Sequence, residues 1–181
     1  MNQLERVVPS PIGPIRLRAD RAGRLTGLRI GGDVHAPAPA PAPSPDHPGD
    51  LEEGGTHVLD DAVAQLAEYF EGRRRCFDLP LATEGSPFQR RVWDQLLQIP
   101  FGTTTSYGQM ATELGRPGAA RAVGHANARN PIAVIIPCHR VVGASGSLTG
   151  YGGGIAVKQH LLDLEARAPS RPARKQRLRL P

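Results

Sequence analysis

Cys138 is followed directly by His139 and Arg140, and these three residues form the part of the sequence best suited to nucleophilic chemistry. A cysteine attacks as a thiolate, and its ordinary pKa of about 8.5 falls when cationic or hydrogen-bonding groups lie nearby. We expect His139 and Arg140 to supply such groups and so to lower the pKa of Cys138. The apolar, mostly β-branched residues 132–136 stand between two prolines and predict a short buried strand. Most free cysteines are only small buried hydrophobes. The flanking residues instead favour a thiol held at a strand exit, both buried and reachable.

His139 is poorly placed to act on Cys138 directly, because neighbouring side chains point apart along a strand. A bridging water is the natural proton relay between the two. A histidine that acts as a base also needs an acceptor for its other ring nitrogen. Asp163 and Glu165 lie in a predicted helix further along the chain, and the residues alone leave the choice between these two carboxylates open.

The elements that must position this site begin with an N-terminal scaffold. Residues 15–18 and 28–30 alternate apolar with charged side chains between turn signals, which predicts antiparallel strands. Repeated Ala-Pro pairs make residues 35–55 a surface loop or linker. Apolar residues at helical spacing predict a helix over residues 58–70, and strict alternation predicts another strand over residues 77–81.

The C-terminal half is predicted to be mainly helical. Ser86 and Ser106 each begin a capping box, since a glutamine follows three residues later in both places. Gly115 is expected to end the helix that begins after Ser106. The predicted helices span residues 87–100, 107–114, 119–128 and 155–165.

Residues 107–128 have the pattern of a helix-turn-helix, in which the second helix docks on DNA. Ala120, Ala122 and Gly124 give that second helix small side chains, so it could approach a groove closely. Arg121 is the only Lys or Arg within the predicted helix, and we expect it to insert into the base stack.

These elements predict an α+β fold. A small N-terminal antiparallel-sheet domain with a helix would occupy residues 1–84, including the Pro/Ala-rich loop. A mainly helical, winged-helix-like domain carrying the helix-turn-helix would occupy residues 85–166. Residues 167–181 would form a basic tail.

Charge supports a polyanionic partner for the C-terminal half. The chain has 181 residues and a net charge of +5, and its basic residues exceed its acidic ones only after residue 84. No apolar run reaches the length of a membrane span, and no signal-peptide core is present at the N-terminus, so we expect a cytoplasmic protein without membrane contact. Two cysteines are too few for a disulfide framework or a four-cysteine zinc site.

The motif Pro-Cys-His-Arg-Val at residues 137–141 resembles the active-site segment of the O6-alkylguanine-DNA alkyltransferases. Asn130-Pro131 before it and Gly150–Gly154 after it belong to the same likeness, which runs from about Ser86 to Glu165. The resemblance implies irreversible, stoichiometric transfer of the alkyl group from O6-alkylguanine, and from O4-alkylthymine, in double-stranded DNA to Cys138. It implies DNA binding through the minor groove, a monomer when free, and no need for a cofactor or metal.

The resemblance also assigns roles to matching positions. Glu165 would hold His139, Asn130 would brace the active-site turn, and Tyr107 would help to rotate the nucleotide out of the duplex and donate a proton to the guanine ring. Arg121 would fill the vacated place in the stack. The substrate pocket would be formed by Val141, Tyr151, Gly152 and Lys158.

Two other functions are compatible with these residues. The helix-turn-helix could recognise lesions and recruit other repair factors while Cys138 stays idle. A Cys-His hydrolase is a weaker alternative, because its histidine normally lies far from the cysteine in sequence.

Overall fold

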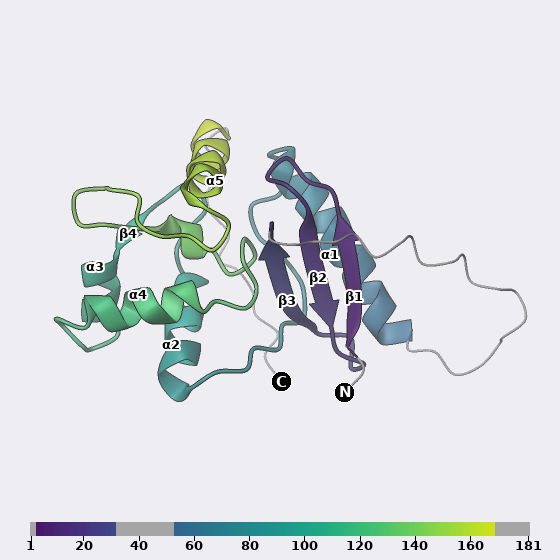
Figure 1. The fold of residues 1–181 in the computed structure, drawn as a ribbon, viewed down its shortest axis with the longest axis horizontal. Coiled ribbons are helices and arrows are strands. Elements are labelled where there is room, and N and C mark those ends of the chain that lie inside the picture. Colours follow the sequence, from purple (N-terminus) through teal and green to yellow (C-terminus); the bar gives the residue numbers. More distant parts are fainter. Residues whose placement is uncertain (1–2, 32–52, 169–181) are drawn as a thin grey trace, which may run out of the picture.

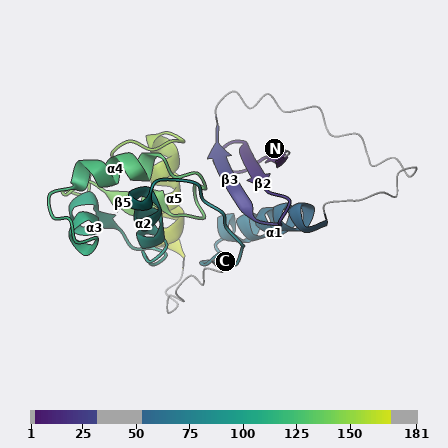
Figure 2. The ribbon, with the colours of Figure 1, turned by 90° about the horizontal axis from the view of Figure 1, so that it is seen from below.

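The computed structural model describes residues 3–31 and 53–168. Figure 1 shows a small sheet backed by one long helix, standing beside a half of the molecule that is mainly helical. Figure 2 shows the same two halves side by side from below. This arrangement confirms the predicted α+β class, with the antiparallel sheet first and the helical half second.

The N-terminal sheet has three antiparallel strands in the order β1-β2-β3. Ile15 and Leu17 point into the core while Arg16 and Arg18 face outward, because side chains alternate along a strand. The two predicted strands are therefore confirmed, and a first strand that the sequence analysis did not propose precedes them. The strands are β1 (Leu4–Val8), β2 (Ile15–Ala19) and β3 (Leu25–Ile30).

Helix α1 spans Glu53–Phe70 and packs against β1 and β2. It begins five residues before the predicted start, so the prediction of a loop over residues 35–55 is wrong for its last three residues, and the rest of that loop lies outside the described residues. Gly72 follows the helix with a φ of 72°, a left-handed conformation that glycine adopts without steric cost.

The predicted strand over residues 77–81 is wrong. Phe77, Leu79 and Leu81 are buried as expected, but only Leu81 pairs with the sheet, through a single parallel bridge to Leu25. Pro80 lies inside the segment and has no amide hydrogen, so a regular ladder cannot run through it.

The helical half contains α2 to α5 and a two-stranded parallel sheet. Both predicted capping boxes are confirmed, with the hydroxyls of Ser86 and Ser106 accepting from the amides of Gln89 and Gln109. Helices α3 and α4 pack against each other as the helix-turn-helix prediction requires. The helices are α2 (Pro87–Leu96), α3 (Tyr107–Glu113), α4 (Ala120–Ala128) and α5 (Ile155–Arg167), and the strands are β4 (Thr105–Ser106) and β5 (Val141–Val142).

The predicted strand over residues 132–136 is also wrong, because these residues form a turn. Val134 has a φ of 68°, which is a strained conformation for a β-branched residue. Ile132 alone bridges to the sheet, at Leu28. A buried apolar run is compatible with both a strand and a turn, so the composition of this segment does not distinguish the two structures.

Strand β3 joins the two halves at this turn. The amide of Leu28 donates to the carbonyl of Pro131 at 2.9 Å, and the amide of Ala133 donates to the carbonyl of Leu28 at 3.2 Å. The segment that leads to Cys138 is thus hydrogen-bonded to the edge of the N-terminal sheet.

The domain boundary at residue 84 stays a prediction. Arg167 belongs to α5 rather than to a tail, and residues 169–181 of the predicted basic tail lie outside the described residues. Among the described helices, none is long and apolar enough to cross a membrane.

Candidate active site

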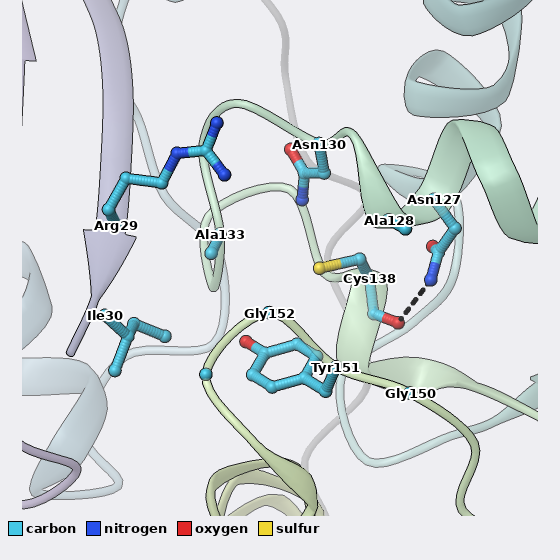
Figure 3. A pocket seen from close by; sticks show the side chains of 11 residues that line it. Arg29, Ile30, Asn127, Ala128, Asn130, Ala133, Cys138, Gly150, Tyr151 and Gly152 are labelled. Carbon is cyan, nitrogen blue, oxygen red and sulfur yellow. Dashed lines mark hydrogen bonds between the residues drawn. The ribbon is translucent and has the colours of Figure 1, made fainter. Parts of the chain in front are cut away.

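Cys138 begins a short 3-10 helix, η1 (Cys138–Arg140), rather than standing at the end of a strand. Its side chain is only 5% exposed. A cavity of about 50 Å³ lies beside it, lined by residues from β3, from the end of α4, from the turn and from the loop of Gly150–Gly153 (Figure 3). The thiol is therefore both buried and next to open space, as predicted.

Asn130 fixes the turn that leads to Cys138. Its Nδ2 donates to the carbonyl of Ile136 at 2.8 Å, and its Oδ1 accepts from the amide of Ile132 at 3.0 Å. Both ends of the turn are thereby held by one buried side chain. Asn127 adds a longer contact, in which Nδ2 lies 3.4 Å from the carbonyl oxygen of Cys138. These bonds explain why the apolar run turns instead of extending.

His139 is fully buried and binds Glu165, with Nε2 lying 2.8 Å from Oε1. Its Nδ1 is buried and has no hydrogen-bond partner among the described residues. Burial lowers the pKa of His139, although the neighbouring carboxylate acts in the opposite direction. A neutral imidazole that donates from Nε2 has its lone pair on Nδ1, so that nitrogen is free to accept a proton.

Glu165 receives a dense set of donors, and Asp163 does not share them. The guanidinium of Arg140 donates to both of its oxygens at 2.9 Å, the hydroxyl of Tyr69 donates to Oε1 at 2.8 Å, and the amide of Gly102 donates to Oε2 at 2.9 Å. Burial alone would raise the pKa of Glu165, but His139 and Arg140 outweigh it and hold the pKa far below its ordinary value.

The expectation that His139 and Arg140 lower the pKa of Cys138 is wrong, because both side chains are directed to Glu165. Burial raises the pKa of Cys138, and contact with Asn130 and the charge of Lys158 act in the opposite direction. Burial likewise raises the pKa of Tyr151, and the nearby sulfur of Cys138 adds to that shift. The cation that assists the thiolate is thus Lys158.

Lys158 is fully buried on α5, and burial lowers its pKa. Its Nζ donates to the carbonyls of Val141 at 2.6 Å and Thr149 at 3.2 Å, and lies 6.0 Å from the centre of the Tyr107 ring. Val141 is also fully buried. Neither Val141 nor Lys158 is among the described residues that line the cavity beside the sulfur, so their part in the substrate pocket stays a prediction. Tyr151 and Gly152 do line the cavity.

A wider cleft of about 620 Å³ opens next to the small cavity. Tyr107, Ala120, Arg121 and Gly124 line it from the helix-turn-helix, while Ala122 is exposed on α4 outside it. The Tyr107 hydroxyl accepts from Oγ1 of Thr149 at 3.2 Å, which leaves its own hydrogen available. The cleft and the cavity share Ala128, Gly150, Tyr151 and Gly152, so a group in the cleft lies next to the cavity of Cys138.

Two family models match this chain. The description "6-O-methylguanine DNA methyltransferase, ribonuclease-like domain" matches residues 4–83, and "6-O-methylguanine DNA methyltransferase, DNA binding domain" matches residues 87–167. The chain belongs to the 6-O-methylguanine DNA methyltransferase family. The methylated-DNA--protein-cysteine methyltransferase of Mycobacterium tuberculosis is 51% identical over 166 residues, which cover 91% of this chain and 94% of that protein.

Solved structures support the same family. A crystal structure of the Mycobacterium tuberculosis O6-methylguanine methyltransferase has a TM-score of 0.75 and 44% identity, and covers 93% of this chain and 96% of that one. A second crystal structure from that organism, of the protein in complex with DNA, has a TM-score of 0.73 and 49% identity, and covers 92% of this chain and 95% of that one.

Several members of this 6-O-methylguanine DNA methyltransferase site are not indicated by the sequence. Tyr69 from α1 and Gly102 reach Glu165, and Arg29 from β3 lines the cavity of the sulfur. None of these residues lies near the cysteine motif in sequence, so only the folded chain reveals them. Within the described residues, no group of three or more His, Cys, Asp or Glu could hold a metal ion.

Proposed function

We propose that this chain repairs O6-alkylguanine in duplex DNA by transferring the alkyl group to the sulfur of its own Cys138. The observation that carries the proposal is the position of this sulfur, at a cavity that adjoins the cleft of the helix-turn-helix. A substrate base that enters from the cleft would bring its substituent to the thiol. The names of the curated relatives favour this activity over a protein that only binds lesions.

His139 accepts the proton of the thiol in this proposal. Its Nδ1 carries the lone pair and has no partner among the described residues, while Nε2 is held by Glu165. A water between Sγ and Nδ1 would relay the proton, as expected from the sequence. The imidazolium that forms is stabilised by the carboxylate of Glu165.

The thiolate then attacks the alkyl carbon in line with the bond to O6. The carbon–oxygen bond breaks, its electron pair stays on the guanine, and the base takes up a proton as it leaves. Tyr107 lies in the cleft with a hydroxyl hydrogen that is free to donate to the base. The backbone near Gly152, at the shared wall, would stabilise the negative charge on the leaving base.

DNA would bind through the helix-turn-helix from the minor-groove side. A base inside a duplex cannot reach a buried thiol, so the nucleotide must rotate out of the stack at a cost of roughly a few kcal/mol. Arg121 is exposed on α4 and lines the cleft, where it could occupy the vacated place. The small residues Ala120 and Gly124 permit close approach of this helix, and O4-alkylthymine would enter by the same route.

The product is an S-alkylcysteine thioether, which does not hydrolyse under cellular conditions. Each molecule should therefore react once. The test is to titrate the protein against duplex DNA that carries one O6-methylguanine and to measure the amount of repaired DNA. Repair should stop at one lesion per protein molecule and be absent with Cys138→Ser. Repair beyond that ratio, or by the serine variant, would refute the proposal.

A further inference from the structure

Arg29 is the one charged residue among the eleven described residues that line the cavity of the Cys138 sulfur. It lies on β3 of the N-terminal sheet, next to Ile30, which lines the same cavity. Figure 3 shows its side chain extending from the strand toward Asn130. One side of the cavity beside the Cys138 sulfur is therefore positively charged, and this side comes from the N-terminal half of the molecule.

The guanidinium of Arg29 has no hydrogen bond or ion pair within the described residues, which sets it apart from Arg16, Arg18 and Arg24 in the same half of the molecule. Arg18 lies on the neighbouring strand and donates to Glu5 at 2.8 Å, and Arg16 also pairs with Glu5. Arg24 donates to Asp20 at 2.8 Å. Five donors in a rigid fork suit a planar carboxylate, and those of Arg29 are not taken up by any residue in the ranges 3–31 and 53–168.

The direction from which the base enters places its substituent near Arg29. The base approaches from the cleft of Tyr107 and Arg121. Ile30 and the exposed Arg29 line the cavity of the sulfur and do not line that cleft. When the first carbon of the substituent meets the sulfur, its further atoms extend into that cavity. Ala133 is small and takes up little of the space there.

We propose that Arg29 forms a subsite for O6 substituents that end in a carboxylate, of which carboxymethyl is the smallest. This inference rests on the proposed function and adds to it a residue that recognises charged substituents. A carboxylate next to the attacking thiolate meets like-charge repulsion, which slows the reaction. The guanidinium offsets that repulsion and holds the substituent by charge-assisted hydrogen bonds.

The step is the same displacement as for a methyl group. Sγ forms a bond to the methylene carbon, the bond from that carbon to O6 breaks, and the electron pair leaves with the guanine, which takes up one proton. The carboxylate keeps its charge throughout. The product is S-carboxymethylcysteine, with its carboxylate beside Arg29.

Two small alkylating agents test the subsite without DNA. Iodoacetate and iodoacetamide are similar in size and differ in charge, and peptide mass spectrometry separates reaction at Cys138 from reaction at Cys76. Arg29→Gln should lower the iodoacetate-to-iodoacetamide rate ratio at Cys138 about tenfold. Arg29→Lys should retain most of the ratio, and Arg18→Gln, which removes the same charge from the neighbouring strand, should leave it unchanged. An unchanged ratio in Arg29→Gln would overturn the proposal.

A second experiment uses duplex DNA with one O6-carboxymethylguanine or one O6-methylguanine. Arg29→Gln should slow transfer of carboxymethyl about tenfold and leave transfer of methyl within about twofold. Equal slowing of both groups would instead assign Arg29 to a phosphate contact and overturn the subsite. Failure of the wild-type protein to accept methyl would refute the proposed function, while the iodoacetate ratio would still report on Arg29.

Discussion

Nε2 of His139 lies 2.8 Å from Oε1 of Glu165, with the two side chains 0% and 1% exposed. This contact links the 3-10 helix of the cysteine to α5, although the two residues are 26 positions apart in the chain. It fixes which imidazole nitrogen faces the carboxylate, and so leaves the other nitrogen for proton transfer.

Glu165→Gln should destabilise the protein and slow alkyl transfer. The variant leaves Arg140 as a buried cation without its carboxylate, which costs about 3–5 kcal/mol in free energy of unfolding. Urea denaturation at pH 7 measures this loss, and transfer from DNA with O6-methylguanine measures the rate. Asp163→Asn is the matched control, because the one hydrogen bond of the Asp163 side chain among the described residues comes from Gln159 on the same helix. A Glu165→Gln variant as stable and fast as wild type would disprove the role of this carboxylate.

The stability difference between wild type and Glu165→Gln should depend on pH. The pKa of Glu165 is held far below its ordinary value in the folded protein, so the carboxylate stabilises the fold above the unfolded pKa of about 4.3. Below that pH the unfolded state takes up a proton first, and the stabilisation declines as pH falls. Denaturation at pH 7 and at pH 3 should therefore give a larger difference at pH 7. An equal difference at both values would contradict the low pKa.

Lys158→Met should move the pH dependence of Cys138 alkylation to higher pH. Burial raises the pKa of this thiol and the charge of Lys158 opposes the rise, so removal of the charge leaves less thiolate near neutral pH. One pKa unit would slow reaction with iodoacetamide about tenfold at pH 7.5. Lys158→Arg keeps the charge and should keep the inflection. A lower plateau rate with an unmoved inflection would mean that Lys158 acts only through its bonds to backbone carbonyls.

Asn130→Ala should cost more stability than Asn127→Ala. The first variant leaves the amide of Ile132 buried without a partner among the described residues, at about 1–3 kcal/mol. It also removes one of the two hydrogen bonds to the carbonyl of Ile136, which still accepts from the amide of Cys138. The second removes only the contact of 3.4 Å to Cys138. Thermal and urea denaturation of both variants measure the difference. Equal losses of stability in the two variants would show that Asn130 is not the main residue that holds the turn.

Arg121→Ala should slow repair of duplex DNA about tenfold or more, because the wedge that offsets unstacking is lost. Reaction with free O6-benzylguanine should stay within about twofold, since no base has to leave a duplex. Arg129→Ala is the control, because Arg129 follows the same helix but contacts His125 outside the cleft. Equal losses on both substrates would remove the proposed role from Arg121.

The sequence predicted elements whose signals are local. The capping boxes at Ser86 and Ser106 were found because both partners of each bond lie within three residues. The apolar run before Cys138 was misread as a strand, because burial alone does not reveal that Asn130 binds both ends of the turn. Spacing along a helix could not choose Glu165 over Asp163 either, since that choice depends on which side of α5 meets η1.

Contacts between the two halves could not be predicted from the sequence. Tyr69 and Arg29 lie in the N-terminal half, and nothing beside them in the chain indicates that they reach the site. Tyr69 lies at the site because α1 packs against the sheet. Arg29 lies there because β3 is hydrogen-bonded to the turn at Pro131 and Ala133. The position of each residue is set by tertiary packing, which composition and periodicity do not encode locally.

The central claim is that the sulfur of Cys138 receives the alkyl group. The most direct measurement is peptide mass spectrometry of the protein after incubation with duplex DNA that carries O6-methylguanine, with Cys76→Ser as the matched control. We expect one methyl group on Cys138 in both proteins and unmodified guanine in the DNA. A methyl group on Cys76 instead, or an unmodified Cys138 with the lesion still in the DNA, would contradict it.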